Sequence, residues 1–291
     1  MFQGTLPAMV TPFTKKEKID EEGLRSLIHF LIDHGVDGVV PCGTTGESAT
    51  LTHEEHKRVI KITVEAVHGR VPVLAGTGSN STAESIELTL SAKEMGADGA
   101  LLISPYYNKP TQEGIYQHYR KIAEETAFPL VLYNVPGRTC LNILPETVAR
   151  LSQIEEIVGI KEASADLYQI SRIIDMCGHD FAVLSGDDFT VLPTLMIGGR
   201  GVISVVANVT PGDMAGMTRA FFNQELDRAQ KLHYKMLGLV AAMFLETNPI
   251  PVKTALHLMG KCEETFRLPL CPMAEANREH LKKAMESYGL I

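Results

Sequence analysis

The stretch Ile157-Val158-Gly159-Ile160-Lys161-Glu162 decides the fold, because a short apolar run ends directly in a lysine. Near-continuous apolar residues of this kind are typical of a strand that is buried on both faces of a parallel sheet. In a (β/α)₈ barrel, catalytic residues lie at the carboxyl ends of such strands. Burial would favour the neutral amine of Lys161, which can attack a ketone and form a Schiff base. A solvated lysine at a strand exit is the alternative that this residue alone leaves open.

Strands and helices alternate on both sides of this stretch. Short apolar or β-branched runs predict eight strands, at residues 5–10, 38–42, 71–76, 99–104, 130–134, 158–161, 182–185 and 201–206. Helical periodicity separates them, at residues 21–34, 52–68, 82–95, 111–126, 145–152, 167–177 and 189–197. Strict alternation requires a parallel sheet, and eight repeats fit a closed (β/α)₈ TIM barrel. The main alternative is an open doubly wound sheet, but no GxGxxG motif follows the first strand.

The C-terminal part of the chain is predicted to be helical, because the strand pattern stops near residue 211. Helices are expected at residues 214–222, 226–244, 252–259 and 274–288. No linker rich in glycine, serine or proline precedes them, and their apolar faces need cover. We therefore predict a barrel over residues 1–224 and a C-terminal helical extension over residues 225–291 that packs on it.

Composition limits the classes of function. The 291 residues are 45% hydrophobic and carry a formal net charge of −8, with the basic residues scattered, so we expect no nucleic-acid surface. The five cysteines are odd in number and have no CxxC spacing, which argues against a disulfide framework or zinc site and favours the cytoplasm. Neither a signal-peptide pattern nor a long apolar stretch occurs, so we expect no membrane association.

Polar groups follow several of the predicted strands. The segment Gly43-Thr44-Thr45-Gly46-Glu47 fits either an anion-binding turn or an ordinary loop. Tyr106, Tyr107 and Tyr133 place phenols near the barrel mouth, where each could be a packing residue or a proton carrier. Arg138 could bind a carboxylate through two hydrogen bonds.

Two further clusters have structural explanations. Asp187 and Asp188 could bind Mg²⁺, but no other carboxylates accompany them, so we expect them to cap the following helix. His53 and His56 lack the HExxH spacing, and the pattern from Thr52 to Glu55 predicts a capping box with two exposed imidazoles. We therefore expect no metal site.

Taken together, five segments resemble the class I, Schiff-base aldolase family that contains dihydrodipicolinate synthase and N-acetylneuraminate lyase. They are GTTGE at 43–47, YYNKP at 106–110, YNVPGRT at 133–139, GIKEAS at 159–164 and SGDD at 185–188. The resemblance covers essentially the whole chain. Arg138 and Tyr107 match the synthase branch, which condenses pyruvate with L-aspartate 4-semialdehyde in lysine and diaminopimelate biosynthesis.

The resemblance implies roles for individual residues. Lys161 forms an imine with pyruvate, so no cofactor is required. Tyr133, Thr44 and Tyr107 form a proton relay, with Tyr107 supplied by a neighbouring subunit. Arg138 holds the carboxylate of the semialdehyde, and Thr45 with main-chain atoms near Gly186 and Ile203 completes the pyruvate site.

The resemblance also implies regulation and assembly. In lysine-sensitive synthases, matching residues form a pocket at a dimer interface where L-lysine inhibits; here they are Ser48, Ala49, His53, His56, Asn80, Glu84 and Tyr106. A homotetramer, built as a dimer of dimers, is expected. Two other functions are compatible with the fold. One is a pyruvate-dependent lyase acting on N-acetylneuraminate or a keto-deoxy sugar acid, and the other is a noncatalytic sensor of a small acid.

Overall fold

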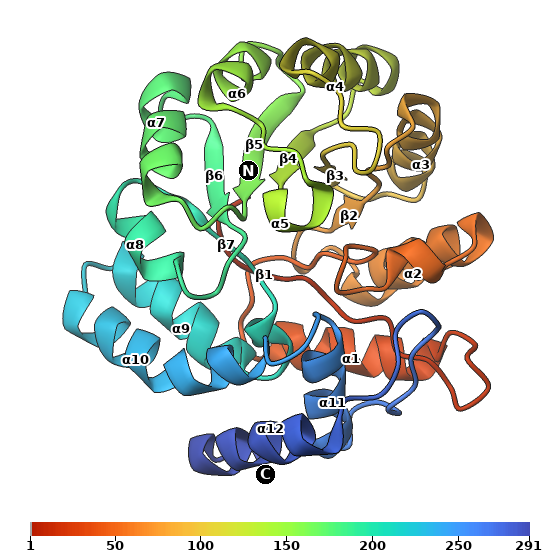
Figure 1. The fold of residues 1–291 in the computed structure, drawn as a ribbon, viewed down its shortest axis with the longest axis vertical. Coiled ribbons are helices and arrows are strands. Elements are labelled where there is room, and N and C mark those ends of the chain that lie inside the picture. Colours follow the sequence, from red (N-terminus) through yellow and green to blue (C-terminus); the bar gives the residue numbers. More distant parts are fainter. Residues whose placement is uncertain (1) are drawn as a thin grey trace.

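The computed structural model describes residues 2–291 and contains one parallel sheet that curls into a barrel (Figure 1). Its seven strands are hydrogen-bonded in the order β1-β7-β6-β5-β4-β3-β2. They are β1 (Gly4–Pro7), β2 (Leu74–Gly76), β3 (Gly99–Ile103), β4 (Leu130–Asn134), β5 (Ile157–Glu162), β6 (Ala182–Ser185) and β7 (Gly201–Ser204).

The segment predicted as a strand at residues 38–42 closes the ring between β1 and β2. It forms isolated parallel bridges, Ala8 with Val40 and Val39 with Val73, and is not a regular strand. The Val40 amide donates to the Pro7 carbonyl at 2.9 Å, and the Leu74 amide donates to the Val39 carbonyl at 3.0 Å. Pro41 has no N–H group to continue the ladder. The predicted closed barrel is therefore correct, whereas the expected regular strand at this position is wrong.

Helices surround the barrel and follow the strands along the chain (Figure 1). They are α1 (Glu21–Asp33), α2 (His53–Val67), α3 (Thr82–Glu94), α4 (Gln112–Thr126), α5 (Pro136–Thr139), α6 (Pro145–Leu151), α7 (Leu167–Cys177), α8 (Val191–Met196) and α9 (Pro211–Phe222). Single 3₁₀ turns occur at η1 (Ser48–Thr50) and η2 (Val206–Asn208). The longer helices were all predicted, but α5, η1 and η2 were not, because one turn carries no periodicity.

Side-chain hydrogen bonds fix the start of helix α2. The Thr52 hydroxyl accepts from the Glu55 amide, and the Glu55 carboxylate accepts from the Thr52 amide at 3.0 Å, so the predicted capping box is confirmed. His53 is exposed as expected, but His56 is buried and bonds to the Gly76 carbonyl at 2.8 Å. The expectation of two exposed imidazoles is therefore wrong for His56, whose side chain turns toward the barrel.

Alternation along the strands decides which side chains enter the barrel. In β4, Val131 and Tyr133 pack inside with residues of the other strands, whereas Leu130 and Leu132 pack outward against the helices. The same alternation in β5 sends Ile160 outward. Lys161, the next residue, therefore points to the barrel interior.

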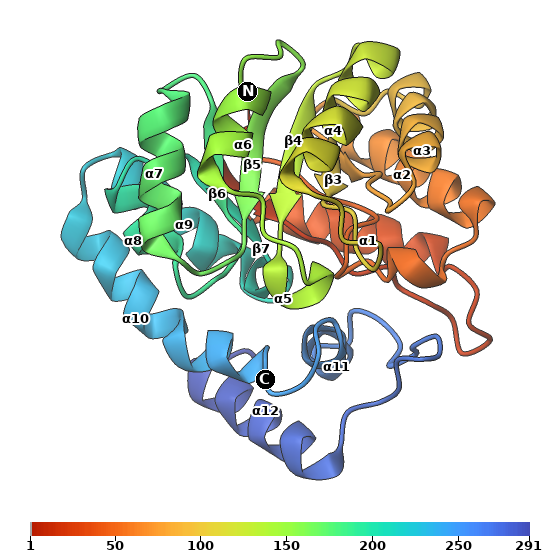
Figure 2. The same cartoon turned by 45° about the horizontal axis from the view of Figure 1, so that its top comes forward.

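The C-terminal helices are α10 (Leu226–Ala242), α11 (Ile250–Leu258) and α12 (Glu275–Tyr288) (Figures 1 and 2). Helix α10 packs against α9 and α12, and α12 packs against α11. The division of the chain at residue 224 stays a prediction. Within residues 2–291, no helix combines the length and apolar character that a membrane span requires.

Candidate active site

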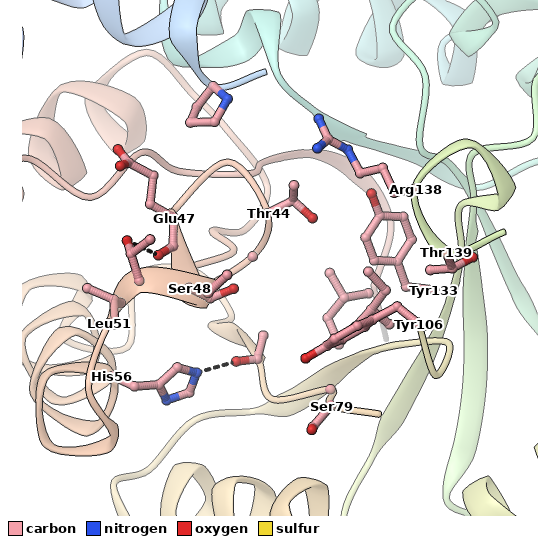
Figure 3. Close-up of a pocket in the computed structure, with 18 of the residues that line it drawn as sticks. Thr44, Glu47, Ser48, Leu51, His56, Ser79, Tyr106, Tyr133, Arg138 and Thr139 are labelled. Carbon is pink, nitrogen blue, oxygen red and sulfur yellow. Dashed lines mark hydrogen bonds between the residues drawn. The ribbon is translucent and has the colours of Figure 1, made fainter. Parts of the chain in front are cut away.

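A cavity of about 610 Å³ opens at the carboxyl ends of the strands (Figure 3). Its lining brings together residues from loops that are far apart in the sequence. The lining includes three of the predicted catalytic and substrate-binding residues, Thr44, Tyr133 and Arg138. It also includes six residues of the predicted lysine site: Ser48, Ala49, His53, His56, Glu84 and Tyr106. Thr44, Tyr133 and Arg138 therefore share one continuous cavity with six of the seven residues of the candidate lysine site.

Lys161 lies inside the barrel behind Tyr133, is not among the residues that line the cavity, and is only 5% exposed. It pairs in register with Tyr133 on the neighbouring strand, and its Nζ atom lies 4.2 Å from the centre of the Tyr133 ring. Gly186 leaves room for it, since a Cβ atom there would lie 3.0 Å from Lys161 Cε. Lys161 is therefore a buried amine held beside a phenol, and not a solvated lysine at a strand exit.

The turn over residues 43–47 contains two hydrogen bonds of its own. The Gly46 amide donates to the Gly43 carbonyl, and the Glu47 amide donates to the Thr44 carbonyl, each at 3.1 Å. Thr45 is buried, and its hydroxyl accepts from the Asn248 side-chain amide at 2.9 Å. Figure 3 shows Thr44 facing Tyr133 across the cavity. The turn thus presents one hydroxyl to the cavity and holds the other against the C-terminal segment.

Arg138 supplies positive charge at the mouth of the cavity. It lies on the single turn α5 after β4, and Figure 3 shows its guanidinium beside the Tyr133 hydroxyl. One N–H group donates to the Asn248 carbonyl at 2.9 Å, which orients the side chain. A guanidinium has five N–H donors, so others remain for a bidentate contact with a carboxylate.

Several predicted residues do not line the cavity. Gly186 lies against Lys161, and Ile203 belongs to the barrel-interior cluster that contains Tyr133. The Asn80 side-chain amide donates to the Tyr106 carbonyl at 3.1 Å and so helps to fix the backbone of that residue. Tyr107 is 91% exposed and is not among the residues that line the cavity of its own chain. A single chain therefore brings Thr44 and Tyr133 into one cavity without Tyr107.

One side of the cavity carries a charged carboxylate. Glu84 accepts hydrogen bonds from the Ser79 hydroxyl and from His53 Nε2, the latter at 2.8 Å. The bond from Ser79 is the largest influence that lowers the pKa of Glu84, so this carboxylate stays ionised. Burial lowers the pKa of His56, whose ring is held by Gly76. This side of the cavity suits a ligand with an ammonium group.

The aspartates of the SGDD segment differ from the prediction. Asp187 accepts from the Phe189 amide at 3.0 Å, in the turn before α8; the N-cap of α8 is Thr190, with no side-chain cap, so the expected capping role of Asp187 is wrong. Asp188 instead accepts from the amides of Val205 and Val206, at 3.0 and 2.9 Å. Its expected role as a cap of the following helix is therefore wrong, because its carboxylate accepts from the two amides that follow β7.

Sequence reasoning missed Asn248 and Lys253. Asn248 contacts Thr45 across 203 residues and Arg138 across 110 residues. Lys253 forms a buried ion pair with Glu47 across 206 residues. A lysine inside the otherwise apolar run around Val252 was the available signal.

Comparison with known proteins agrees with the site. The dihydrodipicolinate synthetase family matches residues 1–288. The 4-hydroxy-tetrahydrodipicolinate synthase of Syntrophus aciditrophicus (strain SB) is 60% identical over 291 residues, which cover 100% of both chains. The dihydrodipicolinate synthase of Acinetobacter baumannii, solved in complex with pyruvate, is 46% identical, with a TM-score of 0.98 and 100% coverage of both chains.

A third relative, from Cyanidioschyzon merolae, was solved with lysine bound. It is 40% identical with a TM-score of 0.97, and the match covers 100% of this chain and 99% of that one. The sequence match spans nearly the whole chain, and the structural matches include its barrel and its C-terminal helices. The chain therefore belongs to the dihydrodipicolinate synthetase family.

Proposed function

We propose that the protein catalyses the 4-hydroxy-tetrahydrodipicolinate synthase reaction, a lyase-class condensation of pyruvate with L-aspartate 4-semialdehyde in lysine and diaminopimelate biosynthesis. One observation carries the proposal: a buried Lys161 amine lies beside the Tyr133 ring, next to a cavity whose mouth holds Arg138. The pyruvate complex of the related synthase from A. baumannii supports the choice of the first substrate.

The reaction begins when the Lys161 amine attacks the ketone carbon of pyruvate. Loss of water gives an imine, which draws electrons from the methyl group, so removal of a methyl proton gives an enamine. The enamine carbon attacks the aldehyde carbon of the second substrate. The amino group of that substrate then displaces Lys161 at the former ketone carbon and closes the ring.

Each of these steps moves protons, and the phenol of Tyr133 lies where they move. Tyr133 and Thr44 face each other across the cavity and can pass protons between the reacting oxygen atoms and solvent (Figure 3). We propose that Tyr107 of a neighbouring subunit completes this relay. We further propose that Thr45 and main-chain groups near Gly186 and Ile203 hold the pyruvate carboxylate.

Arg138 is expected to decide which aldehyde the enzyme accepts. Replacing it with methionine removes the clamp for the semialdehyde carboxylate, so kcat/KM for L-aspartate 4-semialdehyde should fall about 100-fold. Trapping of the pyruvate imine by borohydride should change little, because this step precedes aldehyde binding. Arg150→Met, which breaks a surface pair with Glu113, is the matched control.

The choice of aldehyde also tests the proposed function itself. Purified protein is given pyruvate with L-aspartate 4-semialdehyde or with a sugar aldehyde such as N-acetylmannosamine, and pyruvate consumption is followed. The proposal requires faster turnover of the semialdehyde. Preferred turnover of the sugar aldehyde would establish a sugar-acid lyase instead. A protein that gives no borohydride-trapped pyruvate adduct would be a noncatalytic sensor.

We propose that L-lysine inhibits the enzyme by binding around Ser48, Ala49, His53, His56, Asn80, Glu84 and Tyr106. The ionised Glu84 carboxylate can receive an ammonium group, and the lysine-bound relative from C. merolae supports the ligand. Tyr106 adjoins Tyr107 in the chain, which gives the pocket a direct connection to the proposed relay.

Substitution of Glu84 by glutamine should weaken lysine inhibition. Loss of the carboxylate charge should raise the half-inhibitory lysine concentration about tenfold or more. Glu87→Gln is the control, since Glu87 lies on the same helix and pairs with Lys57 at the surface. Rates without lysine are measured for all three proteins. A Glu84→Gln enzyme as sensitive to lysine as the wild type would remove Glu84 from the site.

We propose that the active form is a homotetramer, a dimer of dimers, in the cytoplasm. Exposed Tyr107 requires a neighbouring chain if it acts in the relay. Large apolar side chains are also exposed on a second surface, formed by α7, α8 and α10, and include Tyr168, Met196 and Tyr234. Light scattering coupled to size-exclusion chromatography gives the mass of the assembly directly.

The proposed cytoplasmic location rests on the cysteines. The five free cysteines in the described chain fit a reducing compartment.

A further inference from the structure

A buried ion pair joins the barrel mouth to the C-terminal helices. Lys253 Nζ in α11 lies 2.6 Å from Glu47 Oε1, and both side chains are 0% exposed. The ammonium also lies 4.0 Å from the centre of the Phe13 ring and 5.4 Å from that of Phe266. The Arg267 amide donates to the second Glu47 oxygen at 3.4 Å. The pair is therefore fully enclosed by protein.

A buried ion pair of this kind adds little net stability to a fold. Removing two charges from water costs several kcal/mol for each ion, and apolar side chains of similar volume often do as well. Burial lowers the pKa of Lys253, and the Glu47 carboxylate opposes this shift. Removal of one partner alone would leave a buried charge without its counter-ion. The pair is better explained by what it holds in place than by net stabilisation.

Glu47 is the last residue of the turn that carries Thr44 and Thr45. Its backbone is left-handed, with φ of 54°, a conformation that a residue with a side chain adopts at a cost. Its amide donates to the Thr44 carbonyl at 3.1 Å, and its carbonyl accepts from the Thr50 hydroxyl at 3.0 Å. Figure 3 shows its carboxylate directed away from the cavity, toward the C-terminal segment. An anchor on this side chain therefore fixes both the turn and the 3₁₀ turn η1 that follows.

We propose that Glu47 and Lys253 are positioning residues of the active site: through this ion pair, helix α11 holds the 43–47 turn so that Thr44 faces Tyr133 and Thr45 stays in place. The inference rests on the proposed function, because the roles of the two threonines come from it. Neither Glu47 nor Lys253 touches the reacting atoms. Arg138 is oriented separately, by the Asn248 carbonyl.

The test uses the double variant Glu47→Gln/Lys253→Met, which removes the pair without leaving an unpaired buried charge. Displacement of a positioned group by about 1 Å can cost up to 100-fold in rate, so we expect kcat to fall and KM for pyruvate to rise, each about tenfold. KM for the semialdehyde should change less than either. Arg278→Met is the control, because it breaks an ion pair with Glu264 within the same C-terminal extension and should leave all three constants unchanged.

Hydrogen exchange gives a second measurement that does not depend on catalysis. The amides of residues 46–50 should exchange faster in the double variant than in the wild type or in Arg278→Met, while the barrel strands keep their protection. If this double variant does not fold, Glu47→Gln/Lys253→Gln carries the same test, with smaller changes in the same direction, because its two neutral amides can bond to each other and leave no buried charge.

Unchanged exchange at residues 46–50 would overturn the inference, as would wild-type values of kcat and of KM for pyruvate. A similar fold-change in kcat and in the KM values of both substrates, together with a lower unfolding temperature, would also overturn it. Such a result indicates general destabilisation. Failure of the proposed function has a different signature: the wild-type protein itself would form no pyruvate adduct.

Discussion

Replacing Lys161 with alanine is expected to abolish the reaction, with kcat reduced about 1,000-fold or more. The reason is chemical, because alanine offers no amine to form the imine and no other lysine is paired in register with Tyr133. Borohydride reduction in the presence of pyruvate should then leave the protein unlabelled. Turnover is measured with both substrates, and unfolding temperature shows whether the variant remains folded.

A surface lysine provides the matched control for this substitution. Lys121 is exposed and pairs with Glu125 on helix α4, so Lys121→Ala should retain both turnover and labelling. If the Lys161→Ala protein were still labelled by pyruvate and borohydride, another amine would be the nucleophile. If it kept wild-type turnover, imine formation at Lys161 would have no part in the mechanism.

Replacing Tyr133 with phenylalanine is expected to lower kcat about 100- to 1,000-fold. The substitution removes the hydroxyl that faces Thr44 and keeps the ring, which packs in the barrel interior beside the Lys161 amine (Figure 3). Proton transfer should slow, whereas binding of the semialdehyde by Arg138 should be retained. Steady-state rates with each substrate varied, together with the rate of borohydride trapping, separate these effects.

Tyr119 is the matched control for Tyr133, since it is another buried phenol packed on the same barrel. Its hydroxyl donates to the Leu102 carbonyl at 3.0 Å and lies outside the cavity lining. Tyr119→Phe should lower the unfolding temperature and leave kcat near the wild-type value. A Tyr133→Phe enzyme that retained wild-type kcat would exclude this hydroxyl from the proton relay.

Much of the barrel could be predicted because local pattern and global fold agree. The apolar run that ends at Lys161 predicted β5, and alternation along that strand explains why Lys161 points inward while Ile160 points outward. The capping-box pattern at Thr52 likewise predicted where α2 begins. Residues 38–42 looked like the other strands, but Pro41 interrupts their ladder, and this proline was the sequence signal against a regular strand.

Contacts between distant parts of the chain could not be predicted from sequence patterns. The Glu47–Lys253 pair joins residues 206 positions apart, and Asn248 reaches Thr45 across 203 positions. Asp188 bonds to the end of β7 and not to the next helix, because closure of the barrel brings β6 and β7 together. The family resemblance identified candidate residues, but their packing required the folded chain.

Mass spectrometry of the borohydride-reduced pyruvate adduct tests the central claim most directly. The protein is incubated with pyruvate, reduced, digested and mapped, with protein reduced without pyruvate as the reference. We predict a single pyruvate-derived modification, located on Lys161, in the peptide that also contains the end of β5. A modification on a different lysine, or no modification at saturating pyruvate, would contradict the account.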